Sequence, residues 1–208
     1  MTRSSRRKRG RAHPTAPSGT PRLGASASPG AAPASIGERA EWGAVALVLG
    51  AAAWLHERAL AFGFFADDFL FLDQVRQRSL IAALLSRDPL GNFLRPLSRQ
   101  LHFWIAARIG HESPAPFHVA NLVYLLIALV LFERIARRIV GPATAILATA
   151  LLALGYSADV PVLWASGSQD LMALALALAA LLLHQRGQRW WGALAYLLAL
   201  FCKETELR

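Results

Sequence analysis

The sequence predicts an all-α fold, a polytopic bundle of transmembrane helices. Hydrophobic residues make up 55% of the 208 residues and charged residues only 17%, which is too apolar for an ordinary soluble domain. Long apolar segments recur along the chain from about Trp42 onward. The formal charge of +9 is spread unevenly, because basic residues gather before the first apolar segment and in short clusters between later ones.

The first region, residues 1–38, is rich in Arg, Pro, Ser, Gly and Ala and has no apolar period. We expect a disordered basic tail, which the positive-inside rule places in the cytoplasm, close to anionic lipid. Nucleic-acid binding is disfavoured because no Phe, Tyr or Trp interleaves with the arginines. A twin-arginine signal at Arg6-Arg7 is disfavoured because roughly thirty residues separate it from the first apolar run.

The second region, residues 39–208, is predicted to be the membrane domain. Its first span begins near Trp42, and the uniformly apolar part, residues 43–55, covers only about 20 Å of a hydrocarbon core of roughly 30 Å. The helix must therefore continue toward Phe62. Residues 68–86 then alternate apolar and polar side chains at helical spacing, which predicts a helix lying in the interface plane.

Later spans are predicted at residues 117–139, 141–156 and 170–184, with a loop at 157–169 and the start of another span at 190–202. Between Gly141 and Leu183 the only Asp, Glu, Lys, Arg or His residues are Asp159 and Asp170. Trp164, Trp190 and Trp191, which lie beside these spans, fit aromatic-belt positions at the membrane interfaces.

The topology depends on residues 97–109, which are too few and too polar for a lipid-facing span. If this segment is re-entrant or interfacial, the arginine clusters at 134–138 and 186–189 face the cytoplasm. If it crosses, both clusters face outward, against the positive-inside rule. We therefore expect a multi-pass protein of the inner (plasma) membrane with a cytoplasmic N-terminus. The candidate site residues then share the outer face: Asp67, Asp68, Asp170 and Lys203.

Two adjacent carboxylates, Asp67 and Asp68, lie in the aromatic run FGFFADDFLFL directly after the first span. In soluble proteins such a pair commonly forms a turn or a helix cap. At a membrane boundary, however, ionised groups are costly unless they are paired, hydrated or used in function. We therefore take Asp67 and Asp68 as the candidate catalytic residues. The pair is compatible with a divalent metal, but without a His cluster the sequence does not require one.

Further motifs follow the carboxylate pair in a fixed order: Arg95-Pro96-Leu97, FHVANL from Phe117, WASGSQDL from Trp164, and Lys203-Glu204-Thr205. Together they resemble the GT-C superfamily of integral-membrane glycosyltransferases, in particular its protein O-mannosyltransferase-like branch. The resemblance spans about residue 42 to the end of the chain. Family members are generally much longer, so we expect this chain to be an N-terminal portion that is inactive alone.

The resemblance implies a donor sugar on a polyprenyl phosphate and an acceptor, of unknown identity, that enters from the extracytoplasmic side. Asp67 matches the family's catalytic carboxylate, which takes the proton of the acceptor hydroxyl as C1 is attacked and the lipid phosphate leaves. Asp68 is expected to orient the acceptor or to assist. Membrane lipid and the lipid-linked donor are therefore the expected partners, and no cofactor is certain.

The departing phosphate calls for cationic side chains, of which the Arg guanidinium is best suited. Arg95 and Lys203 are the candidates, with Glu204 holding Lys203 in place and Asp170 as a further substrate-binding residue. Arg95 has an equal alternative as an interface anchor, and Asp170 as a helix N-cap. His118 and Asn121 are interpreted as hydrogen-bonding groups in helix packing, in preference to metal ligands.

A second class of function fits the same spans and tail: a non-enzymatic membrane protein such as a transporter or an assembly subunit. That reading leaves Asp67-Asp68 and Lys203-Glu204 as coincidences, and the sequence shows no convincing internal repeat of the kind many transporters have. The sequence therefore favours a glycosyltransferase dependent on a polyprenyl-phosphate sugar.

Overall fold

The computed structural model describes residues 36–203 except Asn92 and Glu112, and throughout this part the chain forms helices and no strand. The expectation of a disordered tail falls almost wholly on residues outside this part, and so does the candidate Glu204.

The first helix, α1, runs from Ile36 to Leu55 and so begins inside the region assigned to the tail. A 3₁₀ turn, η1 (Glu57–Ala61), continues it after the backbone N–H of His56 has bonded to the carbonyl of Ala52. Together they form a candidate membrane span of 25 residues, Gly37–Ala61. The prediction that the first span extends beyond its uniformly apolar part is confirmed.

Two further helices are long and apolar enough to cross a membrane. One is α5 (Ala115–Val140), and the other joins η4 (Ala165–Gly167) to α8 (Ser168–Gln185). Their positions confirm long apolar helices where spans were predicted, at 117–139 and 170–184, and both are candidate spans. Three such helices, or four if a bent pair counts as one span, indicate a membrane protein.

The segment predicted as a span at 141–156 is shorter than expected. Helix α6 ends at Ala153, having begun at Pro142, and the chain then bends by 58° into residues 156–163. The expected loop at 157–169 is instead mostly helical: η3 (Tyr156–Ala158), α7 (Asp159–Leu163) and η4. The extended backbone of Gly155, with φ −77° and ψ 146°, interrupts the helical hydrogen bonds at the bend.

The interfacial helix predicted at 68–86 is divided into α2 (Asp68–Arg76) and α3 (Leu80–Leu84). The prediction of one continuous helix is wrong, because Ser79 starts a new helix by accepting a hydrogen bond from the Ala82 N–H, at 3.3 Å.

The segment 97–109 lies within η2 (Pro96–Leu101, a π-helix) and α4 (His102–Gly110), and it is not among the helices long enough to cross. Its polar residues Arg99, Gln100 and His102 are buried, so they face protein and not lipid. Burial lowers the pKa of His102 to about 4, so this imidazole is neutral at pH 7. The segment can thus be polar and still lie beside a membrane.

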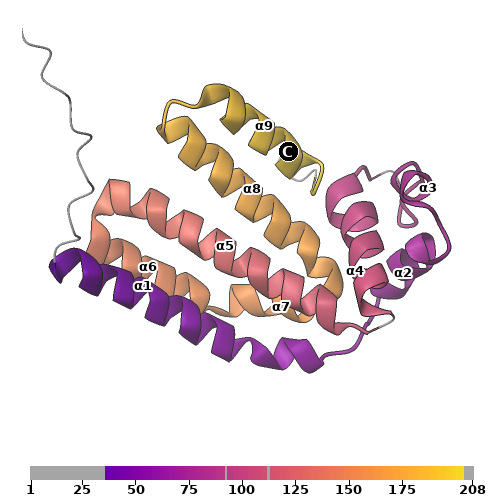
Figure 1. The fold of residues 1–208 in the computed structure, drawn as a ribbon, viewed down its shortest axis with the longest axis horizontal. Coiled ribbons are helices and arrows are strands. Elements are labelled where there is room, and N and C mark those ends of the chain that lie inside the picture. Colours follow the sequence, from indigo (N-terminus) through magenta and orange to yellow (C-terminus); the bar gives the residue numbers. More distant parts are fainter. Residues whose placement is uncertain (1–35, 92, 112, 204–208) are drawn as a thin grey trace, which may run out of the picture. The chain divides into compact units, whose positions relative to one another are not determined.

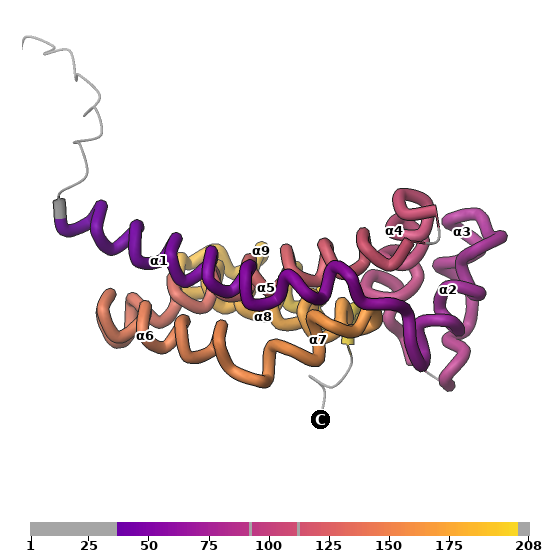
Figure 2. The backbone as a smooth tube through the Cα atoms, turned by 90° about the horizontal axis from the view of Figure 1, so that it is seen from below, coloured from indigo at the N-terminus to yellow at the C-terminus, as the bar shows by residue number. Residues whose placement is uncertain are grey.

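Helix α5 lies in the middle of the described bundle, with α1 and α6 on one side and α8 and α9 (Arg189–Leu200) on the other (Figure 1). Helices α2, α3 and α4 gather at one end, which the perpendicular view also shows (Figure 2). One apolar core joins α1, α5, α7 and α8, and a second joins α2, α3, α4 and the start of α5. The second core includes Ala165, so it places η4 against the group formed by α2, α3 and α4.

Candidate functional site

Asp68 is fully buried at the start of α2 and is bound from both sides. Its Oδ1 accepts hydrogen bonds from the backbone N–H of Ser166, at 2.9 Å, and from the Ser166 hydroxyl. Its Oδ2 accepts from the N–H of Phe65 at 3.2 Å. Burial raises the pKa of Asp68, and these donors oppose that rise because they favour the charged form. The carboxylate therefore connects the loop after the first span to η4.

Asp67 is half-buried and precedes the first residue of α2. Although it occupies the N-cap position, its side chain accepts no capping hydrogen bond from the helix. The residue before it, Ala66, has φ +52°, a left-handed conformation that costs a non-glycine residue about 1–2 kcal/mol. A strained backbone next to an uncommitted carboxylate is an arrangement that clusters at functional sites. Of the two carboxylates, Asp67 is thus the one whose oxygens can accept a proton or a hydrogen bond from a bound molecule.

The WASGSQD segment is held in place by α5. Asn121 Nδ2 donates to the carbonyl oxygens of Trp164, at 2.7 Å, and Pro161, at 3.1 Å, while His118 Nδ1 lies 3.2 Å from that of Val162. These carbonyls lie at helix ends, where the backbone would otherwise be unsatisfied. The packing role predicted for His118 and Asn121 is what the structure shows.

Gly167 allows this segment to pack as closely as it does. A Cβ atom at position 167 would lie 2.1 Å from the carbonyl oxygen of Pro161, a contact that real Cβ atoms do not make. Glycine is therefore required here for close backbone approach. This requirement places the two flanking serines, Ser166 and Ser168, fully or almost fully inside the protein.

A second polar cluster lies at the start of α8. Arg95 Nη1 donates to Gln169 Oε1 at 2.6 Å, and Lys203 forms an ion pair with Asp170. Ser98 and Ser168 connect the same elements, since Ser168 Oγ donates to the Ser98 carbonyl at 3.2 Å. Asp170 is not a helix N-cap, because Gly167 takes that position in α8. The alternative role predicted for Asp170 is therefore wrong.

The two clusters are anchored on one short stretch of chain. Ser166 binds Asp68, Gln169 binds Arg95, and Asp170 binds Lys203. The structure therefore brings together, at residues 166–170, motifs from four distant parts of the sequence. Glu204, the remaining candidate, lies outside the described residues.

The sequence did not predict two further polar pairs, one buried and one half-buried. Asp88 forms an ion pair with Arg99, whose guanidinium lies 4.2 Å above the Phe71 ring. His56 Nδ1 lies 3.4 Å from Asp159 Oδ1. Asp88 stands among turn residues, and nothing in the sequence marks it as half of an ion pair. Asp159 is one of only two Asp, Glu, Lys, Arg or His residues in a long apolar stretch, so the sequence did offer a reason to expect a partner for it.

In the described part of the chain, no group of three His, Cys, Asp or Glu side chains comes together that could hold a metal ion. Asp67 and Asp68 remain an adjacent pair of oxygen donors, and Asp68 has already accepted three hydrogen bonds. Two carboxylates alone are fewer ligands than a dedicated protein cage supplies to a divalent cation.

Fold and site together define a helical membrane protein with a polar cluster at one end of its bundle. Comparison with family models, with curated proteins and with solved structures finds no match to this chain. What the cluster does must therefore be argued from its own residues.

Proposed function

We propose that this protein is a glycosyltransferase of GT-C type, which transfers a sugar from a polyprenyl-phosphate donor to an acceptor outside the cytoplasm. The observation that carries the proposal is the convergence on residues 166–170 of Asp68, the sequence neighbour of Asp67, with Arg95 and Lys203. A transfer from a lipid phosphate needs a base and a cationic group for the phosphate near each other. The cluster supplies both kinds of group.

In this proposal Asp67 is the general base. Its carboxylate is half-buried and is not used to cap α2, so it can accept the proton of an acceptor hydroxyl. Asp68 is a positioning residue, because its oxygens already accept hydrogen bonds from Ser166 and Phe65. By holding the start of α2 against η4, Asp68 fixes the direction of the residue before it.

Arg95 and Lys203 are the proposed phosphate ligands. Arg95 donates through Nη1 to Gln169 and its guanidinium lies 4.5 Å from the centre of the Phe93 ring; a guanidinium is the side-chain group best shaped to bind a phosphate. Lys203 is paired with the half-exposed carboxylate of Asp170, whose side chain is 44% accessible. A phosphate that entered would compete with Asp170 for this ammonium, which gives Asp170 a role in holding Lys203 ready.

The proposed orientation is a polytopic one with a cytoplasmic N-terminus in an inner (plasma) membrane. At the far end of α5 from the site, Arg137 Nη1 donates to Glu41 at 2.6 Å and Arg137 Nε to Glu133 at 2.6 Å. The arginine cluster and the start of α1 therefore share one end of the bundle, and the candidate site occupies the other. The positive-inside rule assigns the arginine end to the cytoplasm.

One observation favours the non-enzymatic alternative. Asp68, Asp170 and Lys203 are each engaged with another side chain, which is also how polar groups tie membrane helices together. A transporter or assembly subunit would need these bonds for structure alone.

The test is donor turnover by the complete natural protein. Membranes that contain it are supplied with polyprenyl-phosphate sugars, and the release of polyprenyl phosphate is followed. We expect turnover above that of membranes without the protein, and its loss in Asp67→Asn. The matched control is Asp73→Asn, which changes an exposed aspartate of the same helix. Equal turnover in wild type and Asp67→Asn, or none in either with any donor, would support the structural alternative.

A further inference from the structure

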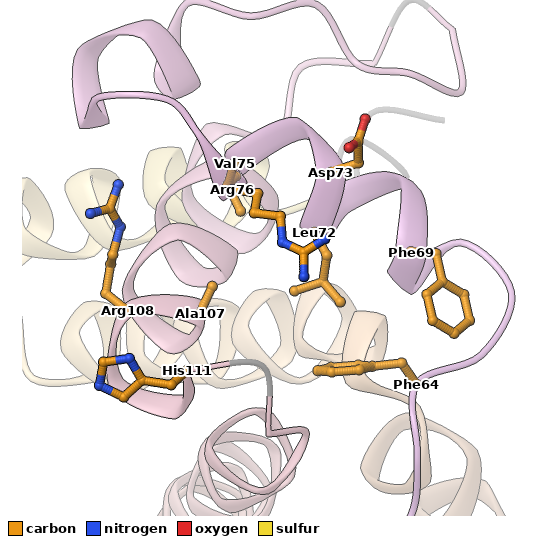
Figure 3. A pocket seen from close by; sticks show the side chains of 9 residues that line it. All are labelled: Phe64, Phe69, Leu72, Asp73, Val75, Arg76, Ala107, Arg108 and His111. Carbon is orange, nitrogen blue, oxygen red and sulfur yellow. The ribbon is translucent and has the colours of Figure 1, made fainter.

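A cavity of about 670 Å³ lies between α2 and the end of α4 (Figure 3). One wall is apolar and comes from the loop after the first span and from α2: Phe64, Phe69, Leu72 and Val75. The other groups include the basic side chains of Arg76, Arg108 and His111. The cavity thus combines an aromatic and aliphatic surface with cationic groups, and the candidate site described above does not use it.

The charge of the cavity is mainly positive among the residues that line it. Among the lining side chains Asp73 is the one carboxylate, and the Arg76 guanidinium is directed toward Phe64 (Figure 3). Arg108 is held in place on the α4 side, since its Nη2 donates to the carbonyl of Arg78 at 3.2 Å and its guanidinium lies 5.0 Å from the Trp104 ring. Most of its N–H donors remain for an anion.

The surface around the cavity is suited to a membrane interface. Large apolar side chains on α2, α3 and α4 are exposed, among them Phe69 at 59%, Ile81 at 71% and Ile109 at 68%. A surface with many exposed large apolar side chains is typical of a site that contacts a membrane or a protein. Here these side chains lie next to helices long enough to span a membrane. Arginine guanidinium groups beside such a surface can form charge-assisted hydrogen bonds with a lipid phosphate.

We propose that this cavity binds the phosphate-bearing headgroup of an anionic membrane lipid. The guanidinium groups of Arg76 and Arg108 hold the phosphate from two helices, and the acyl chains start along Phe64, Phe69 and Leu72. A cavity in the size range of organic ligands is far larger than inorganic phosphate requires, which favours an amphiphile. The proposal does not depend on the glycosyltransferase function.

Binding of lipid here would support the loop that carries the candidate site. Phe64 packs edge-on against Phe117 of α5, with ring centroids 5.2 Å apart, and against Phe69 at 6.4 Å. Both phenylalanines of the cavity wall therefore flank Asp67 in sequence and stand on opposite sides of the Ala66 turn. A lipid seated against them restrains the loop between them.

The experiment compares lipids on the purified full chain in neutral detergent. Phosphatidylglycerol, phosphatidylcholine or soluble glycerol phosphate is titrated, and retained lipid is measured by native mass spectrometry together with the melting temperature. We expect phosphatidylglycerol to bind and to raise the melting temperature. The double variant Arg76→Gln/Arg108→Gln should weaken this binding by on the order of tenfold or more, as for two charge-assisted contacts.

The control pair is Arg78→Gln/Arg87→Gln, which removes two exposed arginines of the same region that do not line the cavity. It should bind like wild type. A second variant, Ala107→Phe, fills the cavity and keeps both arginines, so it should also lose the lipid while circular dichroism shows an unchanged helix content. Equal loss in the control pair, no preference over phosphatidylcholine, equal binding of soluble glycerol phosphate, or unimpaired binding in Ala107→Phe would each overturn the proposal.

Discussion

Asp68 and Ser166 are 98 positions apart in sequence, and they form two hydrogen bonds through one carboxylate oxygen inside the protein. The contact fastens the loop after the first candidate span to the beginning of the third. Because the carboxylate is buried, the cost of losing a donor is larger than at a surface.

Ser166→Ala should therefore destabilise the fold. It removes the hydroxyl donor and leaves Asp68 with two backbone N–H partners, at a cost of about 1–3 kcal/mol. The free energy of unfolding, measured by denaturant titration in detergent, checks this. Ser157→Ala, at an exposed serine, is the matched control and should change stability by less than about 0.5 kcal/mol. Similar values for both variants would show that the contact does not stabilise the protein.

Stability should depend on the titration of Asp68. The pKa of Asp68 is raised in the folded state, so the folded protein binds more protons than the unfolded chain above the ordinary value of 3.8. Its contribution is therefore present at low pH and lost as pH rises through the folded pKa. The difference in unfolding free energy between wild type and Asp68→Asn, measured from pH 3.5 to 8, should change with this sign. A flat difference would contradict the raised pKa.

In the proposed enzyme, the two carboxylates should separate by function. Asp67→Asn should reduce donor turnover about 10²–10⁴-fold, because the amide keeps the shape and loses the basicity. Asp68→Asn should reduce turnover less and lower stability more than Asp67→Asn does. Turnover of the natural protein and its melting temperature are the two measurements. Equal and small losses of turnover would indicate a structural pair.

Gly167→Ala should prevent correct packing of the WASGSQD segment. The added Cβ has no room beside the Pro161 carbonyl, and overpacking typically costs about 1–3 kcal/mol or more. Gly50→Ala is the control, since nothing lies within 4 Å of its Cβ position in α1. There the higher helix propensity of alanine should stabilise the helix slightly. A melting temperature in Gly167→Ala equal to that of wild type would be inconsistent with the close contact.

The proposed orientation predicts which residues an impermeant thiol reagent reaches in intact cells. In a Cys202→Ser background, Gln77→Cys and Arg87→Cys should be labelled, since both positions are exposed and lie in the chain that joins α2, α3 and η2 at the site end of the bundle. Ser4→Cys, in the basic tail, should be labelled only after the cells are permeabilised. Labelling of Ser4→Cys in intact cells, or protection of the other two, would reverse the orientation.

Composition and apolar runs predicted the all-helical class, the first candidate span and those at α5 and α8, because a helix that crosses a membrane has to be long and continuously apolar. The bend after Ala153 and the break at Ser79 were missed. In both places a local backbone event divides a stretch whose hydrophobic pattern continues without change. The hydrophobic periodicity predicts which face of a helix is buried, but it does not predict where a helix is interrupted.

At the site, single residues were easier to predict than their partners. The convergence of Asp68 with Ser166 and of Arg95 with Gln169 depends on how three segments fold back on one another, which spacing along the chain does not contain. The sequence assigned catalysis to Asp67 and an orienting or assisting role to Asp68 through the family resemblance, but it did not indicate that only Asp68 is fully buried. Their difference in burial arises from the left-handed turn at Ala66, a conformation that alanine seldom adopts and that no pattern would suggest.

The buried pairing of Asp88 with Arg99 bears on how this protein can evolve. Loss of one partner strands the other charge inside the fold, at a cost of about 3–5 kcal/mol, which approaches the whole stability of a small domain. Replacement of both by apolar residues of similar volume is often neutral. We therefore expect substitutions at these two positions to be tolerated when they occur together and to be damaging when they occur singly.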